Sequence, residues 1–335
     1  MINRKLIHVL LGITFTSFGQ STSGELENNS PLRFEVKASF ETTPVLSLDD
    51  AADDVCVWIP DNSSAPIFIV GTDKKRGLET YDEKGLRVFD QAFGRINNVD
   101  LWNTSMGPIV VGSNRTFKSI DFYQLNRLDG SLRLLNRYKT ELDDVYGITV
   151  YQREEGTQVF ITDKDGTILQ YDVALIDQFV SARPTGSFRF SSTVEGIKGD
   201  SFYQRLYVAE EDKGLWMIDL SSKGKKRTKV YKTDKVNLVA DLEGVALLDF
   251  ENGEGYLFVS VQGANSYAVF NRKTLQLIAL FSISEGEQIG AVQETDGIEV
   301  VSKNNFSYFI AQDGHNEGSQ NYKLVRLQDI LNRLR

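Results

Sequence analysis

The chain has 335 residues, 41% of them hydrophobic, with 46 acidic residues against 37 Lys and Arg. This length fits one large domain or two ordinary ones, and the composition supplies a proper core, which argues against a disordered chain. The formal net charge of −9 argues against nucleic acid and anionic membranes as partners, because Lys and Arg contacts to phosphate dominate that kind of affinity.

Residues 1–20 have the pattern of a secretory signal peptide. Arg4 and Lys5 precede the apolar run LIHVLLGITFTSF, which small or polar residues follow. The run is shorter than the roughly 20 residues that a bilayer span needs. We therefore expect export to the periplasm or the medium, with 21–32 as a flexible segment and 33–335 as the folded domain. The exported chain would retain 35 basic and 46 acidic residues, a charge near −11.

Short apolar runs then recur between Gly, Asn and Asp turns, which predicts an all-β chain. Six segments contain a polar residue that is followed by a short apolar strand: DDVCVWI, NNVDLW, VYGITVY, VEGIKG, LEGVALL and TDGIEVV. A second run follows each one, and third runs such as GLETYD complete the unit. The single cysteine, Cys56, excludes an internal disulfide and is expected to pack within its strand rather than to react.

Six repeats of about four strands predict a six-bladed β-propeller, in which each blade buries its faces against its neighbours. As a hypothesis, residues 32–40, LRFEVKASF, supply an outer strand to the last blade and close the ring, so that no sheet edge stays open. The tail LVRLQDILNRLR, residues 324–335, is expected to form a short amphipathic helix on the outside.

Two series of polar residues are predicted to meet at one mouth of the central channel. In an antiparallel blade, the start of the innermost strand and the end of the second strand lie on the same face. The starts contribute Asp53, Asn98, Tyr146, Glu195, Glu243 and Asp296. The ends contribute Lys74, Arg115, Lys164, Glu211, Gln262 and Asp313. We expect a basic half from the first three blades and an acidic half from the others.

Crowded carboxylates need a cation among them. Two unit charges 4 Å apart interact by about 4 kcal/mol at an effective dielectric of 20. Oxygen ligands suit Ca²⁺, and the scarcity of His and Cys argues against zinc or copper. Together with metal, the three cations would attract a ligand that carries several phosphates. The alternative is that each charge only caps a strand or pairs across a loop.

At these residues the sequence resembles the β-propeller (alkaline) phytases, or 3-phytases, from about Glu41 to Lys323. The segments that carry the resemblance, in the family's order, are DDAADDVCVW, TDKKRGLETY, GRINNVDL, GSNR, VYGITVY, AEEDKGLW, DLEGVAL, QGANSYAVF, ETDGIEV and AQDG. The resemblance implies hydrolysis of phosphate from myo-inositol hexakisphosphate (phytate), with several Ca²⁺ ions and attack by a calcium-bound water. It also implies a monomer.

The resemblance also implies roles for individual residues. Its phosphate-binding groups would be Lys74, Arg115, Tyr146 and Lys164, which with Glu195 and Glu211 form the expected catalytic set. Its calcium ligands would be Glu41, Asp53, Asp54, Glu195, Glu211, Asp241, Glu243 and Asp296. The chain departs from the family at Gly290, where an aspartate ligand is usual, and at Asp165, where a glutamate is usual. Glu285 or Glu287 is a candidate substitute for the missing ligand.

Elimination leads to the same chemistry. After export, His315 would be the one histidine left, too few for a phosphohistidine route, and Cys56 does not begin a Cys-x5-Arg loop. Direct attack by water whose pKa a metal lowers remains. Two alternatives stay open: a calcium-dependent, lactonase-like propeller hydrolase, and a non-catalytic or degenerate propeller that binds calcium and phosphate.

Overall fold

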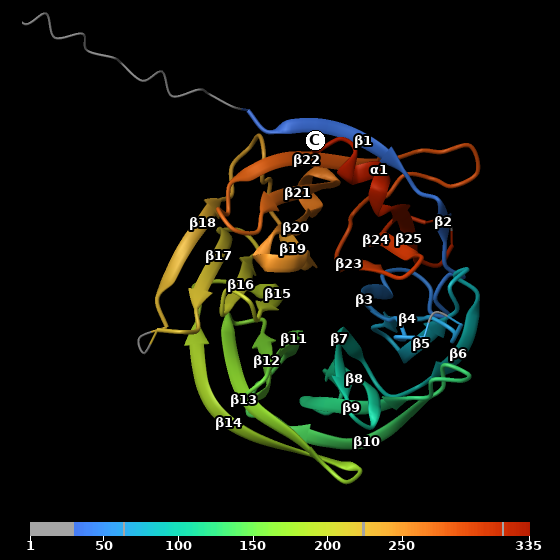
Figure 1. The fold of residues 1–335 in the computed structure, drawn as a ribbon, viewed down its shortest axis with the longest axis vertical. Helices are drawn as coiled ribbons and strands as arrows, with labels where there is room; N and C mark the ends of the chain where they lie inside the picture. Colours follow the sequence, from blue (N-terminus) through green and yellow to red (C-terminus); the bar gives the residue numbers. More distant parts are fainter. Residues whose placement is uncertain (1–29, 63, 223–224, 317) are drawn as a thin grey trace, which may run out of the picture. The chain divides into compact units, whose positions relative to one another are not determined.

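The computed structural model describes residues 30–62, 64–222, 225–316 and 318–335. Within these residues, six sheets are arranged around a central axis, and almost all of the regular structure is β (Figure 1). The expected six-bladed β-propeller is therefore confirmed. The predicted signal peptide, residues 1–20, and residues 21–29 of the predicted flexible segment lie outside the described residues.

We number the blades 1 to 6 in chain order and give their strands from the centre outward. Blade 1 comprises β3 (Ala52–Trp58), β4 (Phe68–Asp73), β5 (Gly77–Tyr81) and β6 (Arg87–Gln91). Blade 2 comprises β7 (Ile96–Thr104), β8 (Gly107–Asn114), β9 (Ser119–Leu125) and β10 (Leu132–Lys139). Blade 3 comprises β11 (Val145–Arg153), β12 (Gly156–Asp163), β13 (Thr167–Ile176) and β14 (Phe179–Arg189).

The other three blades continue the same antiparallel order. Blade 4 comprises β15 (Val194–Asp200), β16 (Arg205–Glu210), β17 (Gly214–Asp219) and β18 (Arg227–Lys232). Blade 5 comprises β19 (Leu242–Asp249), β20 (Gly255–Val261), β21 (Ser266–Asn271) and β22 (Leu277–Ser284), with the short 3-10 helices η1 (Glu251–Gly253) and η2 (Gln262–Ala264) in its turns. Blade 6 comprises β23 (Ile298–Lys303), β24 (Phe306–Asp313), β25 (Asn321–Arg326) and β2 (Phe40–Glu41).

The N-terminal run closes the ring, but differently from the hypothesis. Most of it forms β1 (Leu32–Lys37), which pairs in parallel with β22 as a fifth, outermost strand of blade 5 (Figure 1). The end of the run reaches blade 6, where β2 pairs with β25 in antiparallel register and the Ser39 amide donates to the Leu324 carbonyl. The run therefore spans two neighbouring blades. β1 runs parallel to β22 of blade 5, and β2 runs antiparallel to β25 of blade 6.

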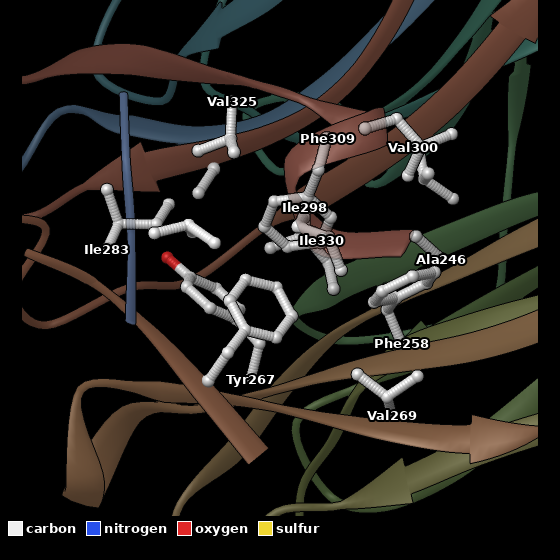
Figure 2. Packing of buried hydrophobic residues seen from close by; sticks show 14 of the residues in the cluster. Ala246, Phe258, Tyr267, Val269, Ile283, Ile298, Val300, Phe309, Val325 and Ile330 are labelled. Carbon is white, nitrogen blue, oxygen red and sulfur yellow. The ribbon is translucent and has the colours of Figure 1, made fainter. Parts of the chain in front are cut away.

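The hydrophobic core is divided into clusters that lie between adjacent blades. Figure 2 shows one of them, in which Phe258 of blade 5 meets Phe309 of blade 6, with ring centroids 5.4 Å apart. The cluster between blades 1 and 2 contains Cys56, which is buried as expected. Because both faces of the inner part of each blade are covered, second strands such as β4 and β8 are buried along their whole length and do not alternate.

The C-terminal tail is helical over a shorter stretch than the sequence indicates. Residues 324–326 belong to β25, and α1 covers only Leu327–Leu331. Leu327 and Ile330 are buried in the cluster between blades 5 and 6, so the helix packs on the outside as expected (Figure 2). In the part of the chain that the structure describes, no helix has the length and apolarity to cross a membrane.

Candidate active site

A cavity of about 670 Å³ opens at the rim where the inner strands begin. Residues of both polar series line it: Lys74, Tyr146, Glu211, Glu243, Gln262 and Asp296, together with Asp241. These residues come from blades 1, 3, 4, 5 and 6, so the repeat does bring the starts of inner strands and the ends of second strands to one face. His315 and the loop residue Asp50 also line this cavity.

Close contacts between blades set the spacing of this rim. A Cβ on Gly147 would lie 1.9 Å from the carbonyl oxygen of Glu195, and a Cβ on Gly196 would lie 1.7 Å from that of Glu243. Only glycine allows these backbones to approach so closely. The glycine that follows Tyr146 or Glu195 therefore determines how near each site residue lies to that of the next blade.

Three carboxylates form the centre of the site. Glu195, Glu211 and Glu243 each offer an oxygen, and these three oxygens lie within 4.8 Å of one another. Burial, and then the Asp53 charge, raises the pKa of Glu195 well above its usual value. Burial followed by the charge of Glu211 does the same to the pKa of Glu243, and burial with Asp241 raises the pKa of Glu211 to about 7.

Lys74 occupies a second part of the site, between carboxylates of blades 1 and 6. Its Nζ lies 2.8 Å from Asp53 Oδ1, 3.4 Å from Asp296 Oδ2 and 2.7 Å from Asp50 Oδ1. Burial opposes the charge of this ammonium, but Asp53 and Asp296 outweigh it and raise the pKa of Lys74. The expected division into a basic and an acidic half is thus wrong, since this cation sits among acids.

Arg115 and Lys164 flank Tyr146. The Arg115 guanidinium donates from Nε and Nη2 to the two carboxylate oxygens of Asp144, each at 2.9 Å. Lys164 Nζ lies 4.4 Å from the centroid of the Tyr146 ring, a cation–π distance. Burial, and then the nearby Glu195, raises the pKa of Tyr146, so its hydroxyl stays protonated.

Asn97 connects the two parts of the site and was missed by the sequence reasoning. Its Nδ2 lies 3.0 Å from Asp53 Oδ2 and 2.7 Å from Glu195 Oε1, and its Oδ1 accepts from Arg115. The sequence alignment assigned this place to Asn98. Counting back from Val55 and Val99, which hold equivalent positions in the β3–β4 and β7–β8 pairs, would have identified Asn97 as the partner of Asp53.

The last member of the second series is also shifted by one residue. Asp313 ends β24, whereas Lys74 and Arg115 follow the ends of β4 and β8. Asp313 belongs instead to a structural set at the ends of second strands, whose side chains accept hydrogen bonds from backbone amides of nearby turns: Asp73, Asn114, Asp163, Glu210 and Asp313. The residue after β24 is Gly314, so blade 6 contributes no charge there.

Two of the expected calcium ligands lie apart from the carboxylate centre. Asp54 accepts a hydrogen bond from the Val99 amide at 3.1 Å, and burial raises its pKa to about 8. Glu41 lies on β2, at the outer edge of blade 6, and pairs across the strands with Lys323. Its carboxylate lies 4.0 Å from the Lys323 ammonium, and Glu41 does not line the cavity.

The positions that depart from the family pattern lie outside the carboxylate centre. Asp165 pairs with Arg189 at the surface. Glu285 and Glu287 are exposed in the loop before β23 and do not line the cavity, so nothing in the structure favours them as substitute ligands there.

Comparisons with known proteins agree with this arrangement. The family model described as Phytase matches residues 2–335. The 3-phytase of Bacillus subtilis (strain 168) is 32% identical over 352 aligned residues, which cover 97% of this chain and 91% of that protein.

Solved structures resemble the chain in fold. A chain of the crystal structure of BBS1N in complex with ARL6DN gives a TM-score of 0.50 at 9% identity, covering 83% of this chain and 78% of that one. A chain of the nidogen/laminin complex gives a TM-score of 0.49 at 14% identity, covering 75% and 82%. The family match and the Bacillus relative, each over nearly the whole length, show that the chain is an enzyme of the phytase family.

Proposed function

We propose that this phytase releases phosphate from myo-inositol hexakisphosphate with Ca²⁺ held at the carboxylate centre. The carrying observation is that Glu195, Glu211 and Glu243 converge at the same rim as Lys74 and Tyr146. The name of the Bacillus relative, 3-phytase, supports the same substrate. The crowded carboxylates favour a bound cation. Such a cation, together with Lys74, favours a ligand with several negative groups.

The carboxylate centre fits a hard cation. Its ligand atoms are all oxygens, which Ca²⁺ prefers, and Glu243 Oε2 is buried with no hydrogen-bond partner. Leaving such an atom unpaired costs free energy unless a cation or a water pairs with it. Glu195, Glu211 and Glu243 would hold the ion, with Asp241 beside Glu211 as a further ligand. When bound there, Ca²⁺ would neutralise phosphate charge and lower the pKa of a water molecule.

The chain's own cations would bind and orient the substrate. Arg115 is held by Asp144 and presents its remaining donors to a phosphate group, for which its planar fork is suited. Lys74 and Lys164 supply point charges to the transferring group or to a neighbouring phosphate. The protonated Tyr146 hydroxyl can donate to a phosphate oxygen. Three cations at one rim favour a phosphate ester over a lactone as the substrate.

The other expected ligands, Asp53 and Asp296, have a different role in this proposal. Both carboxylates contact Lys74, and Gln262 Nε2 donates to Asp296 Oδ1 at 2.6 Å. They hold the ammonium in place at the cavity wall. A further cation between Asp53, Asp54 and Asp296 would require Lys74 to move toward the substrate.

The test is phosphate release from phytate with and without metal. After dialysis against EGTA, activity should fall at least about tenfold, and added Ca²⁺ should restore it, because phosphate and carboxylate charges then lose their common counter-ion. Circular dichroism of the metal-free protein should show an intact fold. Full activity in EGTA would reject calcium dependence, whereas no phosphate release even with Ca²⁺ would favour the non-catalytic alternative.

Export and a monomeric state are also proposals. Export is supported by the charged and apolar pattern of residues 1–20, followed by the folded unit Pro31–Arg335. The monomer is supported by the family resemblance alone. Secretion and periplasmic location are equally compatible with that pattern.

A further inference from the structure

Lys323 is a buried cation that does not line the cavity at the mouth of the channel. It lies in the middle of β25, between β24 and β2, and its side chain is 2% exposed. Lysine is almost never buried to this extent without a partner. The ammonium therefore has to be matched by oxygens from the surrounding elements.

Three oxygens from three separate segments surround this ammonium. Lys323 Nζ donates to Asp313 Oδ2 at 2.5 Å and to the Ala291 carbonyl oxygen at 3.1 Å, and Glu41 Oε2 lies 4.0 Å away. Asp313 lies on β24, Glu41 on β2, and Ala291 in the loop between β22 and β23. One carbonyl and two carboxylates are a ligand set that would suit Ca²⁺ if the lysine were absent.

The ammonium also ties down the loop that precedes β23. Ala291 accepts from Lys323, while the amide of the next-but-one residue, Gln293, donates to the other oxygen of Asp313 at 3.1 Å. The Lys323–Asp313 pair thus binds the loop twice, once through a carbonyl oxygen of the loop and once through a backbone amide of the loop.

Gly290 shows that this cage has space for another ligand. A Cβ at this position would lie 3.5 Å from Lys323 Nζ, an ordinary contact, and its φ is outside the left-handed region. An aspartate could therefore stand here without strain, and its carboxylate would approach the ammonium. The residues present, with glycine at 290 and lysine at 323, do not fit a metal ion at Glu41.

We propose that the Lys323 ammonium is a built-in cation that replaces a bound metal ion at this position, so that the loop 285–295 is fixed without calcium. In this proposal, Glu41 is a partner of Lys323 instead of the calcium ligand that the family resemblance implies. It does not depend on the ions proposed at Glu195, Glu211 and Glu243, since those side chains make no contact with Lys323.

Limited proteolysis with an endoproteinase that cuts after glutamate tests the proposal, since the loop offers Glu285 and Glu287, both exposed. In the wild-type protein, the cleavage rate at these sites should differ less than about twofold between Ca²⁺ and EGTA. Lys323→Met should be cut at least about tenfold faster in both buffers, because it leaves the buried Asp313 carboxylate without a counter-ion and removes the bond to the Ala291 carbonyl. The control Lys303→Met removes an exposed lysine that pairs with Asp61, and should leave the rate unchanged.

A gain of metal binding gives a second readout. Equilibrium dialysis with radioactive Ca²⁺ should show one more bound ion in Gly290→Asp/Lys323→Asn than in the wild type, and Ca²⁺ should restore protection of its loop. If the loop of the wild-type protein were protected from proteolysis only in Ca²⁺, the proposal would be overturned. This measurement does not require any variant to fold. Because the readouts are cleavage and stoichiometry, they stand whether or not phosphate release proves calcium-dependent.

Discussion

Arg115 illustrates how a single side chain is oriented by its neighbours. Its side chain is 16% exposed, and the guanidinium donates to Asp144 and to Asn97. Few rotamers remain for the side chain, so little conformational entropy is left to lose when a phosphate group binds. Such pre-organisation favours binding of the transition state as well as of the substrate.

Arg115→Ala should therefore lower kcat/KM for phytate by about 10- to 200-fold, because a lost charged hydrogen bond costs about 1.5 to 3 kcal/mol. Steady-state kinetics at saturating Ca²⁺ would measure the change. Arg127→Ala is the control, since Arg127 lies at the opposite end of blade 2, between β9 and β10, away from Asp144 and Asn97. An unchanged kcat/KM in Arg115→Ala would show that Arg115 does not contribute to binding the substrate or the transition state.

Residues of the site were predictable where the repeat aligned them. Glu195 and Glu243 follow from their position before a recurring glycine. Asn97 was missed because an apolar alignment fixes a strand only to within one residue, and one residue reverses the face. Asp144 lies just ahead of β11, as Asp241 lies just ahead of β19, but the repeat does not indicate that its partner is Arg115. The role of Lys323 depends on a burial that sequence composition does not reveal.

At the scale of elements, hydroxyl side chains near the ends of second strands link blades 2, 3 and 5 to the next blade. Ser260 Oγ of blade 5 accepts from the Gly244 amide at 2.6 Å and donates to the Asp296 carbonyl of blade 6 at 2.7 Å. Thr162 makes the equivalent link from blade 3 to the Val194 carbonyl of blade 4. These bonds are buried, and they hold the backbone on either side of a site residue.

Ser260→Ala should lower the free energy of unfolding by about 1 kcal/mol, because it removes two buried hydrogen bonds and leaves the Gly244 amide and the Asp296 carbonyl only their 3.2 Å bond to each other. Urea denaturation of the EGTA-treated protein would measure this loss. Ser307→Ala serves as the matched control, since Ser307 Oγ bonds only to Ser302 Oγ, across the exposed ends of β24 and β23. Equal stabilities for the two variants would show that the link between blades 5 and 6 is not needed.

Inner strands were easier to predict than outer ones. The six apolar runs all contain the innermost strand of a blade, because a strand covered on both faces is apolar throughout. The outer strand β18 is largely exposed and has no such signature. The pairing of β1 with β22, which places Leu32 opposite Ala279, could not be predicted. Alternation of apolar and polar residues identifies a strand but not its partner.

For the whole molecule, the crowded carboxylates make the metal-free fold sensitive to pH. The pKa values of Glu211 and Asp296 are raised to about 7 by burial and neighbouring acids, above those of the unfolded chain. A raised pKa means that the folded state binds protons more tightly, so stability falls as the pH rises from the unfolded value through 7. Bound Ca²⁺ would oppose this loss by favouring the ionised carboxylates.

In EGTA, the Tm of the wild-type protein should therefore fall as the pH is raised from 5 to 8, and Glu211→Gln should flatten that fall by at least about 2 °C. The amide does not titrate, so it removes one of the charges that repel. Differential scanning calorimetry across this range would test it. Parallel curves for the wild type and the variant would count against raised carboxylate pKa values at the site.

The way the ring closes has a consequence for biosynthesis. The strands β1 and β2 leave the ribosome before all others, yet their partners β22 and β25 are among the last four strands to emerge. Until translation is nearly complete, the outer edges of blades 5 and 6 do not exist and the first strands have nothing to pair with. Such sequence-distant pairing slows folding, so a nascent chain kept extended until it is complete would suit this architecture better than stepwise folding from the N-terminus.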